Sequence, residues 1–186
     1  MRICMKTRLI ALAALALTAP VTSLPATAQF AAMPEAGEES APQVVDATDP
    51  ELIARILRNE GFKAELKTLA SGAIEIESEY DGTSFWLYFQ ACTADFTGCE
   101  VISFSSGFDF ETAQLPDIIG DWNHDRYSKA YLDEDGDPFV EFSVNMKGGV
   151  TRENFVDTLH WFTTEMSAFI EQIGWNRDLS GQAQPI

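Results

Sequence analysis

Residues 74–90 read Ile-Glu-Ile-Glu-Ser-Glu-Tyr-Asp-Gly-Thr-Ser-Phe-Trp-Leu-Tyr-Phe-Gln, the clearest structural signal in the chain. Its first four residues alternate with period two, which predicts a strand with its isoleucines toward a core and its glutamates toward water. Asp81-Gly82 is typical of a tight hairpin turn. The next strand, residues 83–90, is apolar on both faces and is therefore expected inside the sheet. Strands joined by such turns pair antiparallel.

The segments around this hairpin predict three helices and further strands. Helices are expected from Asp49 to Gly61, from about Thr112 to Arg126 and from a Thr151 cap to Gly174. Further strands are expected at residues 99–106, 128–132 and 139–146, and residues 62–69 are an undecided edge strand. The predicted fold class is α+β: an antiparallel sheet of five or six strands with helices packed on it.

The N-terminus predicts export. A basic stretch precedes the apolar run Leu9 to Leu17, and Ala26-Thr27-Ala28 matches the small-x-small pattern of signal peptidase sites. We expect a signal peptide at residues 1–28, a flexible linker at 29–47, one domain at 48–175 and a flexible tail at 176–186. The expected location is the periplasm or the exterior. No later apolar run has the length of a membrane-spanning helix.

The charge is strongly acidic, with 29 Asp and Glu against 12 Lys and Arg, a net charge of −17. Removal of the leader takes away Arg2, Lys6 and Arg8, so 9 basic residues and a charge of −20 remain. Such a surface repels phosphates, which argues against nucleic acid and anionic lipid as partners. Acidity favours solubility, basic partners or cations, and charge alone does not separate these.

Cys92 and Cys99 are the cysteines left after the leader, and residues 93–98 form a short loop between them. In an oxidising compartment this pair favours a disulfide. A redox-active pair would be expected to show Cys-x-x-Cys spacing, and a zinc site would need further ligands nearby.

Residues 133–137, Asp-Glu-Asp-Gly-Asp, raise the question of calcium. An EF-hand loop starting at Asp133 would put Pro138 where a glycine is needed and Val144 where a bidentate glutamate belongs. A hairpin turn without a physiological metal is therefore predicted. Weak, adventitious calcium binding is the alternative. No cofactor is predicted.

The sequence does not predict an enzyme. His124 and His160 lie on expected helices and outside any nucleophile motif such as Gly-x-Ser-x-Gly. Close carboxylate pairs are expected by chance among so many acids, so a carboxylate-dependent hydrolase or a divalent-cation-binding protein remains the alternative. Most aromatic residues fit core positions, but Trp161 lies off the apolar stripe of its helix and marks a candidate contact surface.

The stretch from Asp49 to Trp175 resembles the YbjN family of bacterial proteins, sometimes described as sensory transduction regulators. The resemblance rests on these motifs: Trp122-Asn123 with Arg126 and Tyr127, Ala130 to Pro138, Gly148-Gly149-Val150-Thr151, and the cysteine pair ahead of Val101-Ile102-Ser103-Phe104. It implies a fold similar to type III secretion chaperones, commonly a homodimer that binds an extended segment of another protein, with no established enzymatic reaction. Many members are cytoplasmic, so the expected signal peptide is a departure.

The leading hypothesis is therefore a non-catalytic protein-binding module of the cell envelope, with a chaperone-like or regulatory role and a protein partner of unknown identity. A homodimer is also expected. The candidate partner-binding residues are Trp161, Trp122, Asn123 and Arg126.

Overall fold

The computed structural model describes residues 43–109 and 113–175. The expected signal peptide, the linker up to residue 42 and the tail lie outside the described residues. The elements follow in the order β1 (Val44–Val45), α1 (Pro50–Asn59), β2 (Lys63–Thr68), β3 (Ile74–Tyr80), β4 (Thr83–Gln90), β5 (Val101–Gly107), α2 (Leu115–Asp125), β6 (Lys129–Leu132), β7 (Pro138–Asn145), β8 (Val150–Thr151) and α3 (Arg152–Ile173).

Six strands form one antiparallel sheet in the order β2-β3-β4-β5-β7-β6. The fold class is α+β, as predicted, and the undecided segment 62–69 supplies the edge strand β2. Strand β4 lies between β3 and β5, which agrees with its apolar character on both faces. The register aligns Ile76, Leu87, Phe104 and Phe142 across four strands, so one face of the sheet is continuously apolar.

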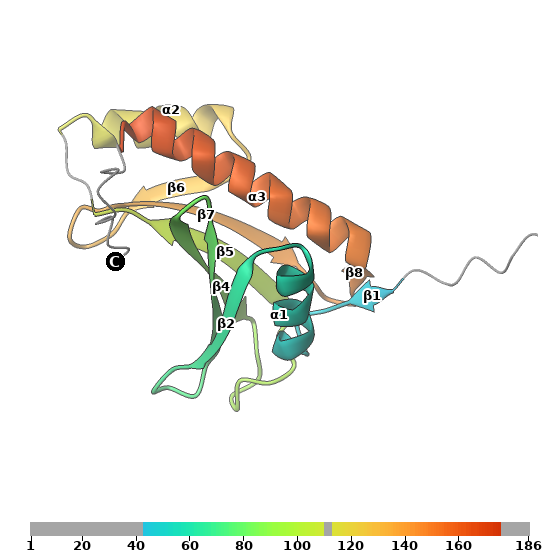
Figure 1. Ribbon diagram of the computed structural model, residues 1–186. Coiled ribbons are helices and arrows are strands. Elements are labelled where there is room, and N and C mark those ends of the chain that lie inside the picture. The colour runs from blue at the N-terminus through green and yellow to red at the C-terminus, as the bar shows by residue number, and fades with distance from the viewer. Residues whose placement is uncertain (1–42, 110–112, 176–186) are drawn as a thin grey trace, which may run out of the picture. The chain divides into compact units, whose positions relative to one another are not determined.

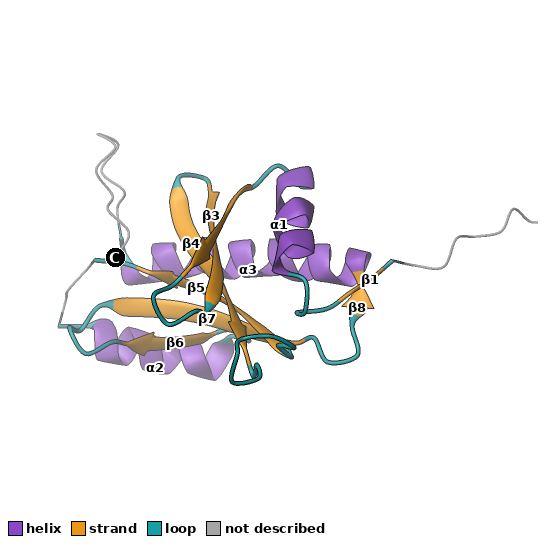
Figure 2. Ribbon diagram, turned by 90° about the horizontal axis from the view of Figure 1, so that it is seen from below, coloured by secondary structure: helices purple, strands orange, loops and turns teal. Residues whose placement is uncertain are grey.

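Helix α3 crosses this apolar face (Figure 1). The ring of Phe162 lies 5.5 Å from Phe85 and 5.4 Å from Phe104, and Phe155 also contacts Phe104. Figure 2 views the molecule from below and shows α2 and α3 behind the strands. Burial of these rings and of the aliphatic residues between them is the main stabilising term of the fold.

The helix ends follow the local sequence signals. The Asp49 side chain accepts a hydrogen bond from the amide of Leu52 at the start of α1, and Thr151 accepts one from Asn154 at the start of α3. Gly174 ends α3 with φ of 73°, a left-handed conformation that favours glycine. Helix α1 packs against β2 and β3, and Arg152 at the start of α3 forms an ion pair with Glu60 at 2.6 Å.

The expected linker at residues 29–47 is corrected at its C-terminal end. Val44 and Val45 pair antiparallel with Thr151 and Val150, and Val45 and Ala47 are each 1% exposed. This short segment thus belongs to the folded domain, because it pairs with β8 and buries the side chains of Val45 and Ala47 against the core. No helix within the described residues is long and apolar enough to cross a membrane.

Candidate partner-binding surface

Three aromatic side chains form an exposed cluster at one margin of the sheet. Trp161 of α3 is 44% exposed and Tyr127, in the loop before β6, is 81% exposed. The Trp161 ring lies 5.6 Å from Tyr127 and 5.5 Å from Phe142 of β7. We call Tyr127, Phe142 and Trp161 the aromatic surface.

The aromatic surface exists because β6 is short. Strand β6 pairs with β7 as far as Glu141, so Phe142 lies just past the paired region and stays half-buried. Trp161 sits between Leu159 and Phe162, which both face the core at 0% exposure, and is therefore turned away from the core. An apolar cluster beside an uncovered strand edge is a common form of protein-binding site.

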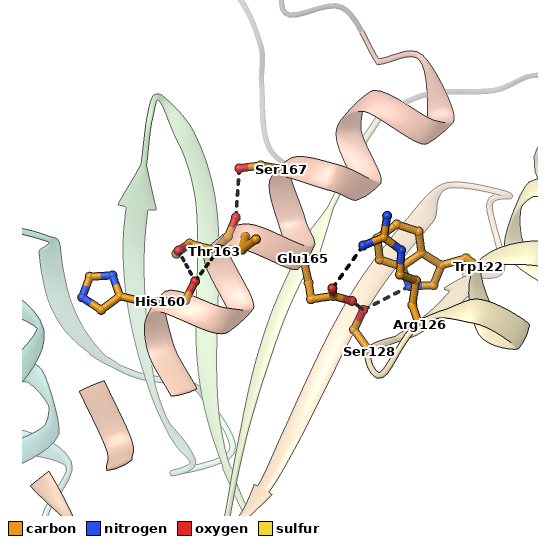
Figure 3. A network of polar contacts seen from close by, with 8 residues as sticks. Trp122, Arg126, Ser128, His160, Thr163, Glu165 and Ser167 are labelled. Atoms are coloured by element: carbon orange, nitrogen blue, oxygen red, sulfur yellow. Dashed lines mark hydrogen bonds and ion pairs between the residues drawn. The ribbon is translucent and has the colours of Figure 1, made fainter. Parts of the chain in front are cut away.

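A polar network holds the neighbouring loop in place (Figure 3). Ser128 donates to Glu165 at 2.7 Å and accepts from the indole nitrogen of Trp122 at 3.1 Å. Arg126 donates to Glu165 at 3.4 Å and its guanidinium lies 4.9 Å from the centre of the Trp122 ring. Glu165 is 5% exposed, so α2, β6 and α3 meet around a buried, satisfied carboxylate.

Two of the four candidate partner-binding residues are structural instead. Trp122 is 0% exposed, so its ring is part of the core and the interpretation of it as a contact residue is wrong. The Asn123 amide donates to the carbonyl of Ala130 at 2.9 Å and its oxygen accepts from the amide of Ala130 at 2.8 Å. These two hydrogen bonds use the polar atoms of the Asn123 side chain to link α2 to β6. Arg126 and Trp161 remain at the surface.

The sequence interpretation missed two members of the aromatic surface. Phe142 lies on the core-facing side of β7, opposite Phe104 of β5. Its partial exposure depends on where β6 begins, at Lys129, which sequence alone does not define. Tyr127 appeared only as part of a family motif, and its position directly after α2, in a loop, was the available signal.

The two cysteines are joined by a disulfide between Cys92 and Cys99. The loop that they close lies between β4 and β5, and Cys99 is 6% exposed. The bond therefore fixes the connection between two interior strands.

The acidic turn is a hairpin between β6 and β7. A carboxylate oxygen of Asp133 accepts from the amides of Asp135 and Asp137 at 3.0 and 2.9 Å. Gly136 has φ of 92°, which closes the turn. Within residues 43–109 and 113–175, no three His, Cys, Asp or Glu side chains are grouped as a metal ion would require.

The histidines show no catalytic pairing among the described residues. His124 is exposed beside Asp125, whose hydrogen bond and charge raise the pKa of the imidazole. The ring of His160 lies 5.8 Å from that of Phe62. Neither imidazole hydrogen-bonds a serine or cysteine side chain in the part of the chain described.

These features define a small antiparallel α+β protein with an exposed aromatic surface and a rigid polar junction beside it. The family model described as "YbjN: putative bacterial sensory transduction regulator" matches residues 49–175, and the chain belongs to the YbjN family. No curated protein matches the chain.

A solved structure has the same fold. It is the crystal structure of YbjN from E. coli, titled a putative transcription regulator, with a TM-score of 0.51 and 17% sequence identity. The match covers 69% of this chain and 92% of that one. At this identity the likeness extends to the fold.

Proposed function

We propose that this protein is a non-catalytic protein-binding module of the cell envelope with a chaperone-like or regulatory role. The observation that carries the proposal is the aromatic surface, where Trp161 and Tyr127 are exposed beside the part of β7 that β6 leaves unpaired. An extended segment of a partner could pair with this strand edge while its apolar side chains contact Trp161. The regulator description of the family supports the same class.

The proposed envelope location rests on the leader pattern at residues 1–28. Fractionation of cells that express the tagged chain tests it, together with N-terminal sequencing of the product. A periplasmic protein that begins at Gln29 is expected. A cytoplasmic protein that retains Leu9 to Leu17 would contradict the location and leave the binding proposal to be tested inside the cell.

Binding is tested by quantitative cross-linking in intact cells with three chains: the wild type, Trp161→Ala and Leu69→Ala. Leu69 is 42% exposed, close to Trp161 in exposure, but it follows the opposite edge strand β2 and serves as the control. Partners that are captured by the wild type and by Leu69→Ala, and lost with Trp161→Ala, support the proposal. Equal capture by all three chains would show that the aromatic surface is not the binding site.

The alternative is a carboxylate-dependent hydrolase or a divalent-cation-binding protein. This alternative rests on the abundance of Asp and Glu in the sequence. An activity screen on envelope substrates, with and without divalent cations, separates the two. Turnover that depends on a named carboxylate would replace the binding proposal.

A further inference from the structure

Residues of α1 and the first residue of α3 border a hollow with a volume of about 400 Å³. Figure 1 shows α1 beside β8, the short strand that leads into α3. The volume lies within the range of pockets that hold small ligands. We call this hollow the arginine pocket, after the three arginines on its wall, Arg55, Arg58 and Arg152.

The arginine pocket concentrates positive charge in a chain that is strongly acidic. The sequence has 29 Asp and Glu, yet among the described residues none of these carboxylates borders the hollow. The described residues contain four arginines, and three of the four lie on this one wall. A local excess of positive charge in a chain of net charge −17 points to a negatively charged ligand.

Arg55 differs from the other arginines in its surroundings. The other three arginines of the described residues each form an ion pair with a glutamate, at 2.6 to 3.4 Å. Arg55 is exposed and forms no ion pair and no side-chain hydrogen bond with any residue that the structure describes. Its guanidinium is therefore available to a ligand in the hollow that it shares with Arg58 and Arg152.

Arg58 and Arg152 are held in place and still have N–H groups for a ligand. Arg58 donates from Nε to the carbonyl of Ala64 at 3.0 Å and from Nη1 to Glu51 at 3.2 Å. Arg152 donates from Nη2 to Glu60 at 2.6 Å. A guanidinium has more N–H groups than these contacts use. Because the contacts already position both groups, a ligand loses less affinity to the ordering of side chains.

The rest of the wall consists of amide and aliphatic groups. Gln43 and Asn59 each contribute a side-chain amide, a group that both donates and accepts hydrogen bonds. The main-chain amide of Arg152 donates to the carbonyl of Gln43 at 2.8 Å, which fixes the backbone at this point. Leu52, which is half-buried, and Ile56 form the apolar part of the wall. Such a wall fits a ligand that combines a carboxylate, a peptide group and an apolar side chain, as the last residue of a peptide does.

We propose that the arginine pocket binds the C-terminal residue of a peptide or protein partner. The carboxylate of that residue accepts hydrogen bonds from Arg55 and the neighbouring guanidinium groups, while its side chain contacts Leu52. A carboxylate fits better than a phosphate for two reasons. It matches the planar fork of a guanidinium, and its single charge is repelled less by a chain of net charge −17.

The arginine pocket goes beyond the proposed function, since it is a different site from the aromatic surface. Arg152 and Trp161 are both on α3, separated by about two and a half helical turns. They therefore lie on opposite sides of the helix, and the two sites can be tested independently.

The test is an NMR titration of the isotopically labelled chain, purified as the cell produces it, at fixed ionic strength. Four probes are compared: acetyl-Gly-Ser-Leu with a free C-terminal carboxylate, the same peptide as its C-terminal amide, acetyl-Gly-Ser-Glu amide, whose carboxylate is on a side chain, and inorganic phosphate. The readouts are the main-chain amide signals of α1 and the side-chain amide signals of Gln43 and Asn59.

The variants are Arg55→Gln and, as a control, Lys129→Gln. Lys129 is exposed on β6, at the opposite edge of the sheet from β2, against which α1 packs. Both changes remove one positive charge, so a difference between them reports the position of the charge. Because Arg55 is exposed and has no partner among the described residues, Arg55→Gln should keep the fold.

The peptide with the free C-terminal carboxylate is expected to shift these signals saturably, and its amide to leave them in place. Arg55→Gln is expected to raise the dissociation constant about tenfold or more, the size of a lost charge-assisted hydrogen bond, and Lys129→Gln to leave it nearly unchanged. Equal binding of the acid and the amide, or equal weakening by the two variants, would overturn the proposal. So would binding of phosphate or of the glutamate peptide as tight as that of the free C-terminus.

The comparison of probes on the wild-type chain decides the matter even if a variant does not fold. Trp161→Ala should bind the free C-terminus normally whatever becomes of the proposed function, so a failure of the aromatic surface and a failure of the arginine pocket are distinguishable.

Discussion

At the scale of single residues, Glu165 shows how a buried charge contributes to this fold. It accepts from Ser128 and Arg126 where α2, β6 and α3 meet. Glu165→Ala should lower the free energy of unfolding by about 2–3 kcal/mol, because the buried Ser128 hydroxyl loses its acceptor and Arg126 loses its ion pair. Glu171→Ala, an exposed change on the same helix, should cost less than about 0.5 kcal/mol. Urea unfolding of both variants measures this, and equal costs would mean that the network adds nothing to stability.

Tyr88 of β4 provides a pH-dependent test of how its phenol is buried. Burial, followed by the charge of Glu75, raises its pKa from 10.0 to about 12. The folded state therefore holds the phenol proton more tightly than the unfolded state does, and this stabilising contribution is complete below pH 10. It is lost as the pH rises from 10 to 12. Unfolding free energies over this range should fall more steeply for the wild type than for Tyr88→Phe, with Tyr127→Phe as a control for an exposed phenol. Parallel curves for the wild type and Tyr88→Phe would contradict the shifted pKa.

At the scale of the elements, local patterns predicted most of what the structure contains. Period-two alternation and Asp81-Gly82 gave β3 and β4, and Thr151 and Gly174 mark the ends of α3 as expected. Segment 43–47 was misassigned because two valines in a polar stretch give no periodic signal, and their partner, β8, lies about a hundred residues later in the chain.

The candidate site was harder to predict because burial depends on tertiary neighbours. Trp122 and Trp161 are both helical tryptophans, yet the first is 0% and the second 44% exposed. Trp122 packs on Phe169 at 5.0 Å, whereas Trp161 contacts Tyr127 and Phe142, which lie beyond the first residue of β6. Glu75 is a similar case, since its burial results from the side chains of neighbouring strands.

The disulfide between Cys92 and Cys99 closes the loop between β4 and β5, and we predict that it stabilises the fold modestly. Reduction, or the double change Cys92→Ser and Cys99→Ser, should lower stability by about 2 kcal/mol, because a short closed loop restricts the unfolded chain modestly. Thermal unfolding with and without reductant measures the change. Intact mass after alkylation tests the bond itself: if both thiols of the purified chain react before any reduction, the disulfide does not form in the cell.

We predict that the hairpin between β6 and β7 does not bind calcium tightly. The carboxylate of Asp133 already serves the amides of Asp135 and Asp137, so binding a cation would compete with the turn. Calorimetric titration should show no calcium site tighter than about 1 mM, the weak end of the range for protein sites. Micromolar binding that disappears in Asp135→Asn would show that the turn is a metal site after all.

At the scale of the whole molecule, charge and apolar surface act in opposite directions on self-association. The net charge of −17 repels a second copy, and the loss of the basic leader residues would make the repulsion stronger. The aromatic surface and the unpaired part of β7 offer an apolar contact that a symmetric dimer could bury. Since a partner protein would use the same surface, dimerisation and partner binding are expected to compete.

We therefore predict a symmetric dimer with Trp161 at its interface. In ~0.15 M salt, exposed charges more than ~8 Å apart are largely screened, so the repulsion between copies is reduced. Burial of an aromatic side chain contributes on the order of 1.5 to 3 kcal/mol, so Trp161→Ala should raise the dimer dissociation constant about tenfold or more. Light scattering across a salt series should show more dimer as salt increases, and Leu69→Ala should behave as the wild type does.

A strictly monomeric mass at high micromolar concentration in physiological salt would rule the dimer out. If a dimer forms but Trp161→Ala leaves its dissociation constant unchanged, the interface lies elsewhere, and the outer edge of β2 at the other side of the sheet becomes the better candidate.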